Sequence, residues 1–358
     1  MRRDIDEYVE QDFARVVLDE AQYIKNPLTQ VARAAKRLPA GVRFALTGTP
    51  IENRLSELWS IFDFLMPGLL GTRESFAKRF ESPVEHAEGD SAARMQALVS
   101  PFVLRRVKED VVADLPEKIE DTVMAQLTGE QRKLYLTNQD RIAQQVQHRE
   151  AGEFKKDKLK VLAELTKLRQ ICCDPRLHYE DYKAGSAKLD TCMELVHGAL
   201  DGGHRILLFS QFTGMLDIIG KRLAKEDIAF LKLTGASSKE SRAKMVAQFQ
   251  AGEVPVFLIS LKAGGVGLNL TAADVVIHYD PWWNVAAQDQ ATDRAHRIGQ
   301  QHTVTVYKLI AKDTIEERIM QMQESKRDLV NSVLGGDGIS SALFTREDVL
   351  ALLGGDGR

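Results

Sequence analysis

The second half of the chain alternates short apolar runs with longer mixed segments, and this alternation limits the possible folds more than any other feature. The apolar runs predict strands at residues 206–209, 229–233, 256–259, 274–279 and 304–310. The segments between them have the apolar spacing of helices, for example at residues 189–200, 215–224 and 238–250. Apolar strands that alternate with helices form a parallel sheet with helices on both faces. The sequence therefore predicts an α/β fold.

A similar apolar run near the start, residues 13–18, predicts a buried strand that is followed at once by Asp19 and Glu20. Open α/β sheets bind ligands at the carboxyl ends of their strands. Adjacent carboxylates there are typical of a site in which the first holds Mg²⁺, often through water, and the second polarises an attacking water. We therefore expect Asp19 to be the metal residue and Glu20 to be a general base.

A second predicted strand, residues 42–46, ends in Thr47, Gly48, Thr49 and Pro50. Small and hydroxyl-bearing residues at this position suit a loop that senses a nucleotide, but the same residues also compose ordinary turns. Neither strand end identifies a function alone.

Two arginines three residues apart lie near the end of the segment 260–300. Residues 284–298 are predicted to form a helix, because Asn284 can cap its start and Gly299 can end its last turn. Arg294 and Arg297 would then share one helix face. Two guanidinium groups on one face suit the charge that develops on a γ-phosphoryl group during transfer. The alternative is a pair of solvated arginines on a surface helix.

Several short motifs follow one another in order along the chain. They read DEAQ from Asp19, LTGTP from Leu46, ILLFSQF from Ile206, AGGVGLNLTAADVVI from Ala263 and QATDRAHRIGQ from Gln290. With DEAQYIKNP, LRRVKEDV, LPEK and YDPWWN beside them, the chain resembles the Swi/Snf-type ATPases, the chromatin-remodeller branch of superfamily-two helicases. The resemblance extends to about Val333. It implies two tandem RecA-like lobes that clamp ATP and Mg²⁺ and move along double-stranded DNA.

The resemblance also implies roles for individual residues. The expected catalytic residues are Glu20, Arg294 and Arg297. The residues expected to bind the nucleotide or to couple it to movement are Asp19, Gln22, Thr47, Gly48, Thr49, Gly265, Gly267 and Gln290. The residues expected to contact DNA are Ser210, Gln211, Thr234, Lys262, Asn269 and Trp283.

Four aromatic side chains near these motifs have less specific expectations. For Trp283, DNA contact and packing between the lobes stay open as alternatives, whereas packing is favoured for Trp282. His278 and His296 are expected to be hydrogen-bonded structural or coupling residues, because no second ligand stands at a spacing typical of zinc sites.

The chain departs from the family pattern in one respect. No G-x-x-x-x-G-K-[ST] occurs in it, so the loop that cradles the β- and γ-phosphates is missing. Such a loop, its helix and the next strand need roughly 30 residues, more than stand before Asp19. We therefore expect the first lobe to be incomplete and the chain to be inactive alone or to need a complementing half, which a separate polypeptide could carry.

Several alternatives stay open for this departure. An internal start, a broken gene and a split protein all explain the missing loop. A non-catalytic nucleic-acid-binding or regulatory remnant is the second function considered, and an unrelated α/β protein with fortuitous motifs is the third.

Composition excludes several classes of protein. A net charge of -3 and a pI near 6.3 argue against a generally basic nucleic-acid coat, so DNA contact must come from a local surface. Cys172, Cys173 and Cys192 have neither a zinc spacing nor the even number of a disulfide framework. No apolar run approaches the roughly 20 residues of a membrane span, and the start lacks a signal-peptide pattern. We expect a cytoplasmic protein without membrane contact, associated with the nucleoid if it is bacterial.

The chain is expected to divide into four parts. Residues 1–130 form a partial first RecA-like lobe with a helical protrusion, residues 131–185 a helical linker, residues 186–334 the second lobe, and residues 335–358 a glycine-rich tail. In the linker, Leu162, Leu165 and Leu168 are predicted to face inward, with Lys160, Lys167 and Arg169 outward. Because a lobe that lacks strands exposes apolar surface, residues 1–130 are predicted to be less stable than residues 186–334.

Overall fold

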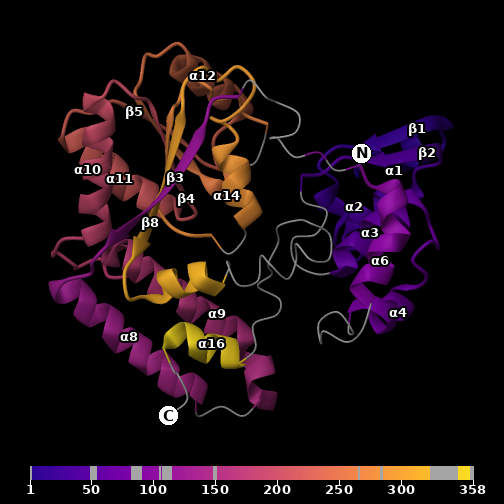
Figure 1. Cartoon of the computed structure of the whole chain (residues 1–358), viewed down its shortest axis with the longest axis horizontal. Helices are drawn as coiled ribbons and strands as arrows, with labels where there is room; N and C mark the ends of the chain where they lie inside the picture. The colour runs from indigo at the N-terminus through magenta and orange to yellow at the C-terminus, as the bar shows by residue number, and fades with distance from the viewer. Residues whose placement is uncertain are drawn as a thin grey trace. The chain divides into compact units, whose positions relative to one another are not determined.

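The computed structural model describes residues 2–48, 55–81, 91–104, 106, 115–147, 151–264, 267–282, 285–322 and 346–354. These residues divide into two compact units (Figure 1). Unit 1 holds the described residues up to Arg106, and unit 2 holds nearly all of those from residue 115 onward. Both units combine parallel strands with helices, so the predicted α/β class is confirmed.

Unit 2 is built on a six-stranded parallel sheet. Its strands are β3 (Lys118–Ala125), β4 (Ile206–Ser210), β5 (Phe230–Leu233), β6 (Val256–Ser260), β7 (Val275–His278) and β8 (Val304–Ala311). In space they follow the order β3-β8-β7-β4-β6-β5, and every pairing is parallel. Their carboxyl ends therefore lie at one edge of the sheet, where Ser210 is paired with Ser260.

Helices cover both faces of this sheet (Figure 1). On one face lie α10 (Ala187–Asp201) and α11 (Thr213–Lys225), and on the other lie α12 (Lys239–Gln250) and α14 (Val285–Thr292). Successive strand residues point to opposite faces, so Leu208 packs into the cluster of α10 and α11 while Leu207 packs with Phe249 of α12. Burial on both faces explains why β4 and β6 are apolar at nearly every position.

A group of helices completes unit 2. It comprises α8 (Gly129–Gln147), α9 (Ala151–Cys173), the helical residues 315–322 and α16 (Arg346–Leu353). The Gln139 Nε2 group donates to the carbonyl oxygen of Leu353 over 2.7 Å, and Arg318 donates to the carbonyl oxygen of Leu352 over 3.0 Å. These bonds satisfy carbonyl groups that the end of a helix leaves without partners inside the helix. Shorter segments are η4 (Pro175–Leu177) and α13 (Leu261–Gly264).

Unit 1 contains two described strands, β1 (Phe13–Leu18) and β2 (Ala40–Ala45), which pair in parallel. Its helices are α1 (Ile5–Val9), η1 (Ala21–Ile24), α2 (Gln30–Arg37), α3 (Leu55–Leu65), α4 (Arg73–Phe76), η2 (Ala77–Glu81), α6 (Ser91–Val99) and η3 (Ser100–Phe102). The Thr29 hydroxyl caps α2 by accepting from the Ala32 N–H over 3.2 Å. Ala32 and Ala35 of α2 pack with Ile61 and Phe64 of α3 in one buried cluster.

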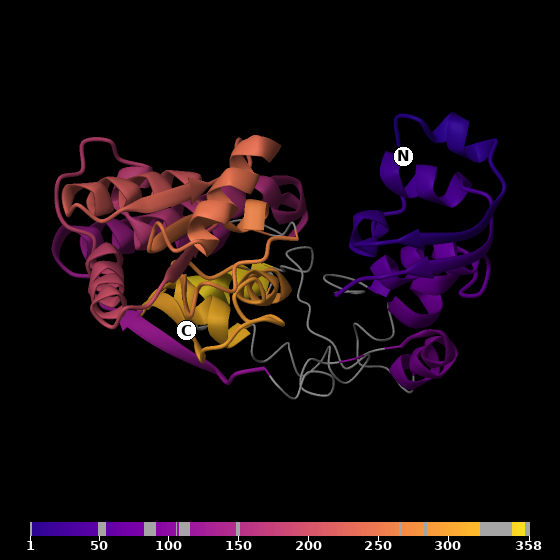
Figure 2. The ribbon, with the colours of Figure 1, turned by 90° about the horizontal axis from the view of Figure 1, so that it is seen from above.

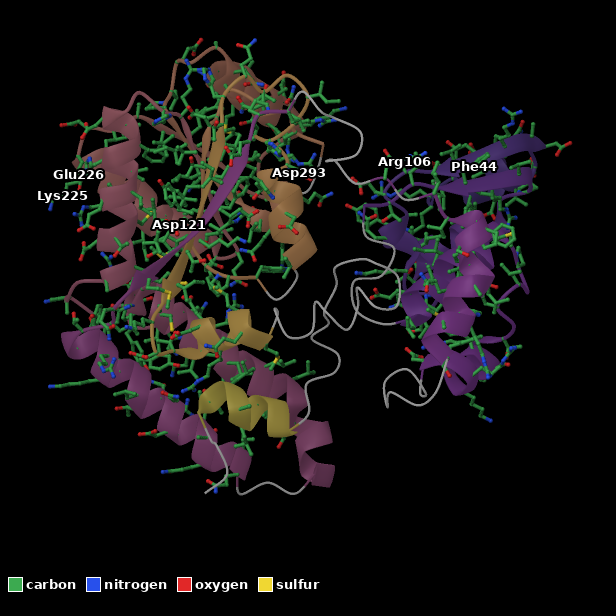
Figure 3. The ribbon with its side chains drawn as sticks, viewed as in Figure 1. Phe44, Arg106, Asp121, Lys225, Glu226 and Asp293 are labelled. Atoms are coloured by element: carbon green, nitrogen blue, oxygen red, sulfur yellow. The ribbon has the colours of Figure 1, made fainter. Side chains whose placement is uncertain are left out.

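One face of the β1–β2 pair is apolar and exposed in the described part of unit 1. Val17 of β1 is 56% exposed, and Phe44, its partner on β2 (Figure 3), is 49% exposed. Val42 and Leu46 alternate with the inward-facing residues and are exposed too. Parallel sheets normally bury both faces, so the exposure of this face is unusual for a parallel sheet. The apolar face consists of Val17, Val42, Phe44 and Leu46.

The structure differs from the predicted division at residue 130. β3 pairs with β8 along its whole length, from Lys118 opposite Val304 to Ala125 opposite Ala311. It is thus an outer strand of the unit 2 sheet (Figure 2), whereas the sequence placed it in the first lobe. A strand's own residues do not specify which sheet it joins, because its backbone groups pair equally well with either edge.

No helix among the described residues is long and apolar enough to cross a membrane.

Candidate nucleotide and nucleic-acid sites

Asp19 and Glu20 follow β1 directly, as predicted, and form a tight turn. Asp19 is exposed, and its Oδ1 accepts from the Glu20 N–H over 2.9 Å. Glu20 has a left-handed backbone with φ of 52°, which non-glycine residues adopt uncommonly and which often marks a functional turn. The turn separates the two carboxylates, leaving Asp19 in solvent while Glu20 is half-buried.

Gln22 joins the end of β1 to the end of β2. Its Nε2 donates to Glu20 Oε2 over 2.5 Å, and its Oε1 accepts from the Thr47 hydroxyl over 2.8 Å. The backbone supports this contact, because the Ala21 N–H donates to the Leu46 carbonyl oxygen over 2.9 Å. The structure thus brings Glu20, Gln22 and Thr47 together, although 25 residues separate the last two.

The first strand end fits a magnesium ion held with few protein ligands. No group of three or more His, Cys, Asp or Glu residues that could hold a metal occurs among the described residues. Mg²⁺ bound with a nucleotide needs only one or two carboxylates, because phosphates and waters complete its shell. The exposed carboxylate of Asp19 meets this requirement.

The arginine segment differs from the predicted helix. α14 ends at Thr292, and residues 293–299 form turns that begin at Asp293 (Figure 3). Arg294 is 7% exposed, whereas Arg297 is exposed, so the prediction that both share one helix face is wrong. The helix ends early because the backbone finds other partners: the Arg294 carbonyl oxygen accepts from the Leu270 N–H over 2.9 Å.

Gln300 holds the turns after α14 against the strand edge. Its Nε2 donates to the carbonyl oxygens of Ala273 over 2.7 Å and Ala295 over 3.1 Å. Its Oε1 accepts from the N–H groups of Gln301 and His302. The shape of the turn that carries Arg297 is therefore set by buried hydrogen bonds rather than by helix geometry.

His278 and His296 are hydrogen-bonded, as predicted. His278 contacts the Thr292 hydroxyl over 2.8 Å, and His296 contacts the Pro116 carbonyl oxygen over 2.8 Å. Burial lowers the pKa of His278 to about 3, so its ring is neutral at physiological pH. The first bond ties β7 to the end of α14, and the second ties the arginine turns to the segment before β3.

The predicted DNA-contact residues that the structure describes lie at the carboxyl edge of the unit 2 sheet or in loops of unit 2. Lys262 and Asn269 are exposed, and Thr234 is half-buried. Ser210 is buried, and its hydroxyl donates to Asp280. Gln211 is half-buried, and its Nε2 has no hydrogen-bond partner among the described residues.

Of the other predicted nucleotide residues, Gly48 and Gly267 are exposed and Gln290 is half-buried on α14. Gly267 has a φ of 38°, which favours glycine. Thr49, Gly265 and Trp283 lie outside the described residues.

The sequence misplaced one residue that the structure puts near this edge. Arg169 of α9 was predicted to face solvent, but its side chain is almost fully buried at 2% exposure. It donates to Gln211 Oε1 over 3.1 Å and to the Pro281 carbonyl oxygen. The prediction followed from the position of Arg169 beside the apolar stripe of the helix, where a charged residue is usually exposed. Its hydrogen-bond partners are 42 and 112 residues away, so the sequence around α9 does not reveal them.

The chain is similar in sequence to known protein families and to individual relatives. Residues 1–177 match the family model of the SNF2-related domain, and residues 187–299 match that of the helicase conserved C-terminal domain. An uncharacterized ATP-dependent helicase of Mycoplasma pneumoniae is 41% identical over 98% of the chain, and one of Mycoplasma genitalium is 39% identical over 98%. Both alignments cover 34% of the relative, so the chain spans about a third of their length.

The fold is similar to that of a solved structure. The SWI2/SNF2 ATPase core of Sulfolobus solfataricus in complex with double-stranded DNA is 37% identical. The alignment covers 93% of the chain and 72% of that core, with a TM-score of 0.54. The tandem RecA-like fold expected from the motifs is therefore confirmed.

Proposed function

The chain belongs to the SNF2 family of helicase-like ATPases, and from this premise we propose that it couples ATP hydrolysis to movement along double-stranded DNA. The observation that carries the proposal is the Gln22 bridge, which joins the carboxylate of Glu20 to the Thr47 hydroxyl. A general base that shares hydrogen bonds with a neighbouring loop can transmit the state of the nucleotide to that loop. The solved Sulfolobus core, whose partner is double-stranded DNA, supports the choice of nucleic acid.

The proposed chemistry gives separate roles to four of the predicted site residues. Glu20 accepts a proton from the attacking water, while Gln22 holds the Glu20 side chain in one orientation. Asp19 would hold Mg²⁺, which would neutralise charge on the phosphates. Arg297, exposed in its turn, contacts the charge that develops on the transferred phosphoryl group.

We propose that Arg294 acts differently from Arg297. Its backbone carbonyl oxygen is bound by the Leu270 N–H, and its side chain is buried. These contacts fix the turns after α14 beside the loop that contains Gly267 and Asn269. Arg294 thus connects the nucleotide residues of unit 2 to its DNA residues.

For DNA, we propose that exposed and half-buried side chains at the carboxyl edge of the unit 2 sheet contact the phosphate backbone. Lys262 supplies a positive charge, and Asn269, Gln211 and Thr234 supply polar groups. Contacts of this kind position a protein without reading sequence, which suits movement along DNA. Because the net charge of the chain is -3, a small number of contacts must carry the binding.

We propose that the phosphate-binding loop reaches the site from outside these 358 residues, in a longer chain or in a second polypeptide. The apolar face of β1 and β2 is the proposed docking surface. Val17 and Phe44 are about half-exposed there, and a segment that brings a further strand and helix would bury them. The proposed partner is thus an α/β segment with an apolar face and the G-x-x-x-x-G-K-[ST] loop.

The test is ATP hydrolysis by the chain with double-stranded DNA, first alone and then with a loop-bearing segment of an SNF2-type core. We expect no turnover alone and DNA-stimulated turnover in the mixture, abolished by Glu20→Gln. DNA-stimulated turnover by the chain alone that Arg297→Ala leaves unchanged would overturn the proposed mechanism. DNA binding without hydrolysis in any mixture would instead favour a non-catalytic nucleic-acid-binding protein.

A further inference from the structure

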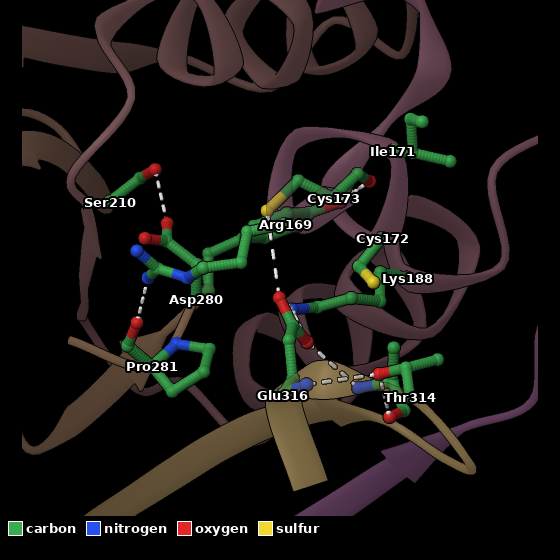
Figure 4. A network of polar contacts seen from close by, with 12 residues as sticks. Arg169, Ile171, Cys172, Cys173, Lys188, Ser210, Asp280, Pro281, Thr314 and Glu316 are labelled. Carbon is green, nitrogen blue, oxygen red and sulfur yellow. Dashed lines mark hydrogen bonds and ion pairs between the residues drawn. The ribbon is translucent and has the colours of Figure 1, made fainter. Parts of the chain in front are cut away.

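Arg169 is a buried arginine that reaches from α9 to the ends of two strands (Figure 4). Its Nη1 donates to Gln211 Oε1 over 3.1 Å, just after β4. Its Nη2 donates to the carbonyl oxygen of Pro281, just after β7. The guanidinium also lies over the ring of Phe212, 5.8 Å from its centre. One side chain thus holds the two loops that follow neighbouring strands of the sheet.

Asp280 completes this arrangement from the other side. It is fully buried, and it accepts from the Ser210 hydroxyl and, over 3.3 Å to each carboxylate oxygen, from the Gln211 N–H. Burial raises the pKa of Asp280, and the charge of Arg169 opposes that rise. The loop at residues 210–212 is therefore bound by Asp280 through its backbone and by Arg169 through the side chain of Gln211.

Other buried polar residues of these helices direct their hydrogen bonds to partners outside residues 210–212 and 280–282. Lys188 of α10 pairs with Glu316 over 2.8 Å, and both side chains are fully buried. Gln131 of α8 donates to the Ile171 carbonyl oxygen over 2.9 Å and accepts from the Ala187 N–H over 3.1 Å. These hydrogen bonds join the helices to one another and, because Glu316 also accepts from the Ala311 N–H, to the end of β8. Arg169 differs from both residues because its hydrogen bonds go to the loops after β4 and β7.

We infer that Arg169 is a positioning residue: from α9 it fixes the loops after β4 and β7 in the arrangement in which Gln211 meets DNA. The effect of Arg169 on DNA binding rests on the proposed function. Its effect on the order of the two loops does not. A planar guanidinium suits this role because its two terminal nitrogens donate in a fixed fork, whereas the donors of a lysine ammonium share one nitrogen, which does not span both acceptors.

The test compares Arg169→Lys with Gln131→Leu. Arg169→Lys keeps a positive charge beside Asp280, so the fold is expected to survive. Gln131→Leu is the matched control, because it removes a buried polar anchor of the same helices without touching either loop. Two quantities are measured: hydrogen exchange at the amides of residues 210–212, 280 and 282, and affinity for double-stranded DNA at one salt concentration.

We expect Arg169→Lys to raise exchange in both loops and to weaken DNA binding about tenfold, as loss of one charge-assisted hydrogen bond would. Gln131→Leu should lower the melting temperature without either effect. If Arg169 acts through Gln211, then Arg169→Lys combined with Gln211→Ala should weaken binding no more than Gln211→Ala alone.

Two results would overturn the inference. The first is unchanged hydrogen exchange in both loops of Arg169→Lys. This result would count against the inference even if the wild-type chain fails to bind DNA. The second is an equal loss of loop order in Gln131→Leu, since the effect would then follow from general destabilisation. Failure of the wild-type chain to bind DNA, with loosened loops in Arg169→Lys, would reject the proposed function and leave the positioning role supported.

Discussion

At the scale of single residues, Gln22 is the side chain on which the first strand-end site most depends. It donates to Glu20 and accepts from Thr47, so it uses both ends of its amide. We expect Gln22→Leu to lower DNA-stimulated ATP turnover of the complemented protein by about tenfold to a hundredfold, because Glu20 loses its orientation. Tyr23→Ser is the control, since Tyr23 is exposed on the same turn. Full turnover in Gln22→Leu would show that the bridge has no role.

Substitutions of Arg294 and Arg297 should have different effects, because one side chain is buried and the other is exposed. Arg297 is exposed, so Arg297→Ala should leave the melting temperature unchanged while lowering turnover about 10³-fold, the loss expected for an arginine finger. Arg294 is buried, so Arg294→Ala should lower both. Lys225→Ala, which removes an exposed cation from α11, controls for the change in charge. Equal turnover in Arg297→Ala and Lys225→Ala would contradict the assignment of Arg297.

At the scale of secondary-structure elements, a charged cluster adds to the backbone pairing of β3 with β8. Glu120 accepts from Lys308 over 2.5 Å and pairs with Lys118 over 2.7 Å. Burial opposes ionisation of Glu120, but the two lysines outweigh it and lower its pKa from 4.5 to about 2. A lowered carboxylate pKa stabilises the folded state above the unfolded pKa, and this contribution is lost as pH falls toward the folded pKa.

We therefore expect Glu120→Gln to lower the free energy of unfolding by about 1 kcal/mol near neutral pH, after allowance for solvent screening of a partly exposed group. The difference from wild type should persist down to about pH 4.5 and shrink as the pH approaches 2. Denaturant unfolding at a series of pH values measures it. Asp121→Asn, on the exposed neighbour in the same strand, is the control. A difference that is constant with pH would rule out the ion pairs as its cause.

The elements also show what sequence can and cannot predict. The ends of strands such as β4 and β6 were predicted to within one residue, because a short uninterrupted apolar run between polar segments is typical of a buried strand. The end of α14 was not, because it depends on the hydrogen bond between Leu270 and Arg294, which the local sequence does not reveal. The same holds for Arg169, whose acceptors come from two distant strands. Local pattern therefore predicts elements and strand ends, whereas contacts between distant segments decide how the site residues are held.

At the scale of the whole molecule, the two units differ in how completely their sheets are covered. The unit 2 sheet has six strands with buried clusters on both faces. In the described part of unit 1, two strands have helices packed on one face, and the apolar face of Val17, Val42, Phe44 and Leu46 is exposed. Local stability follows the amount of buried apolar contact, so unit 1 should open more readily than unit 2.

Hydrogen exchange measures this difference directly. We expect amides of β1 and β2 to exchange at least about 10²-fold faster than those of β4 and β6, a gap of about 3 kcal/mol in opening free energy. Uniform protection of both units would contradict the prediction. Adding the loop-bearing segment should slow exchange in β1 and β2 and leave β4 and β6 unchanged, because only the unit 1 strands gain a covering layer.

A substitution on the exposed face separates docking from general stabilisation. Phe44→Asp places a charge where the segment would pack but disturbs little of the isolated chain, since Phe44 is already half-exposed. The added segment should then fail to slow exchange, and DNA-stimulated turnover should not appear. Leu28→Ser, which changes an exposed apolar residue away from this face, should leave both responses intact. If Phe44→Asp and Leu28→Ser respond alike, the segment docks elsewhere, and the exposed face of β1 and β2 is not its docking surface.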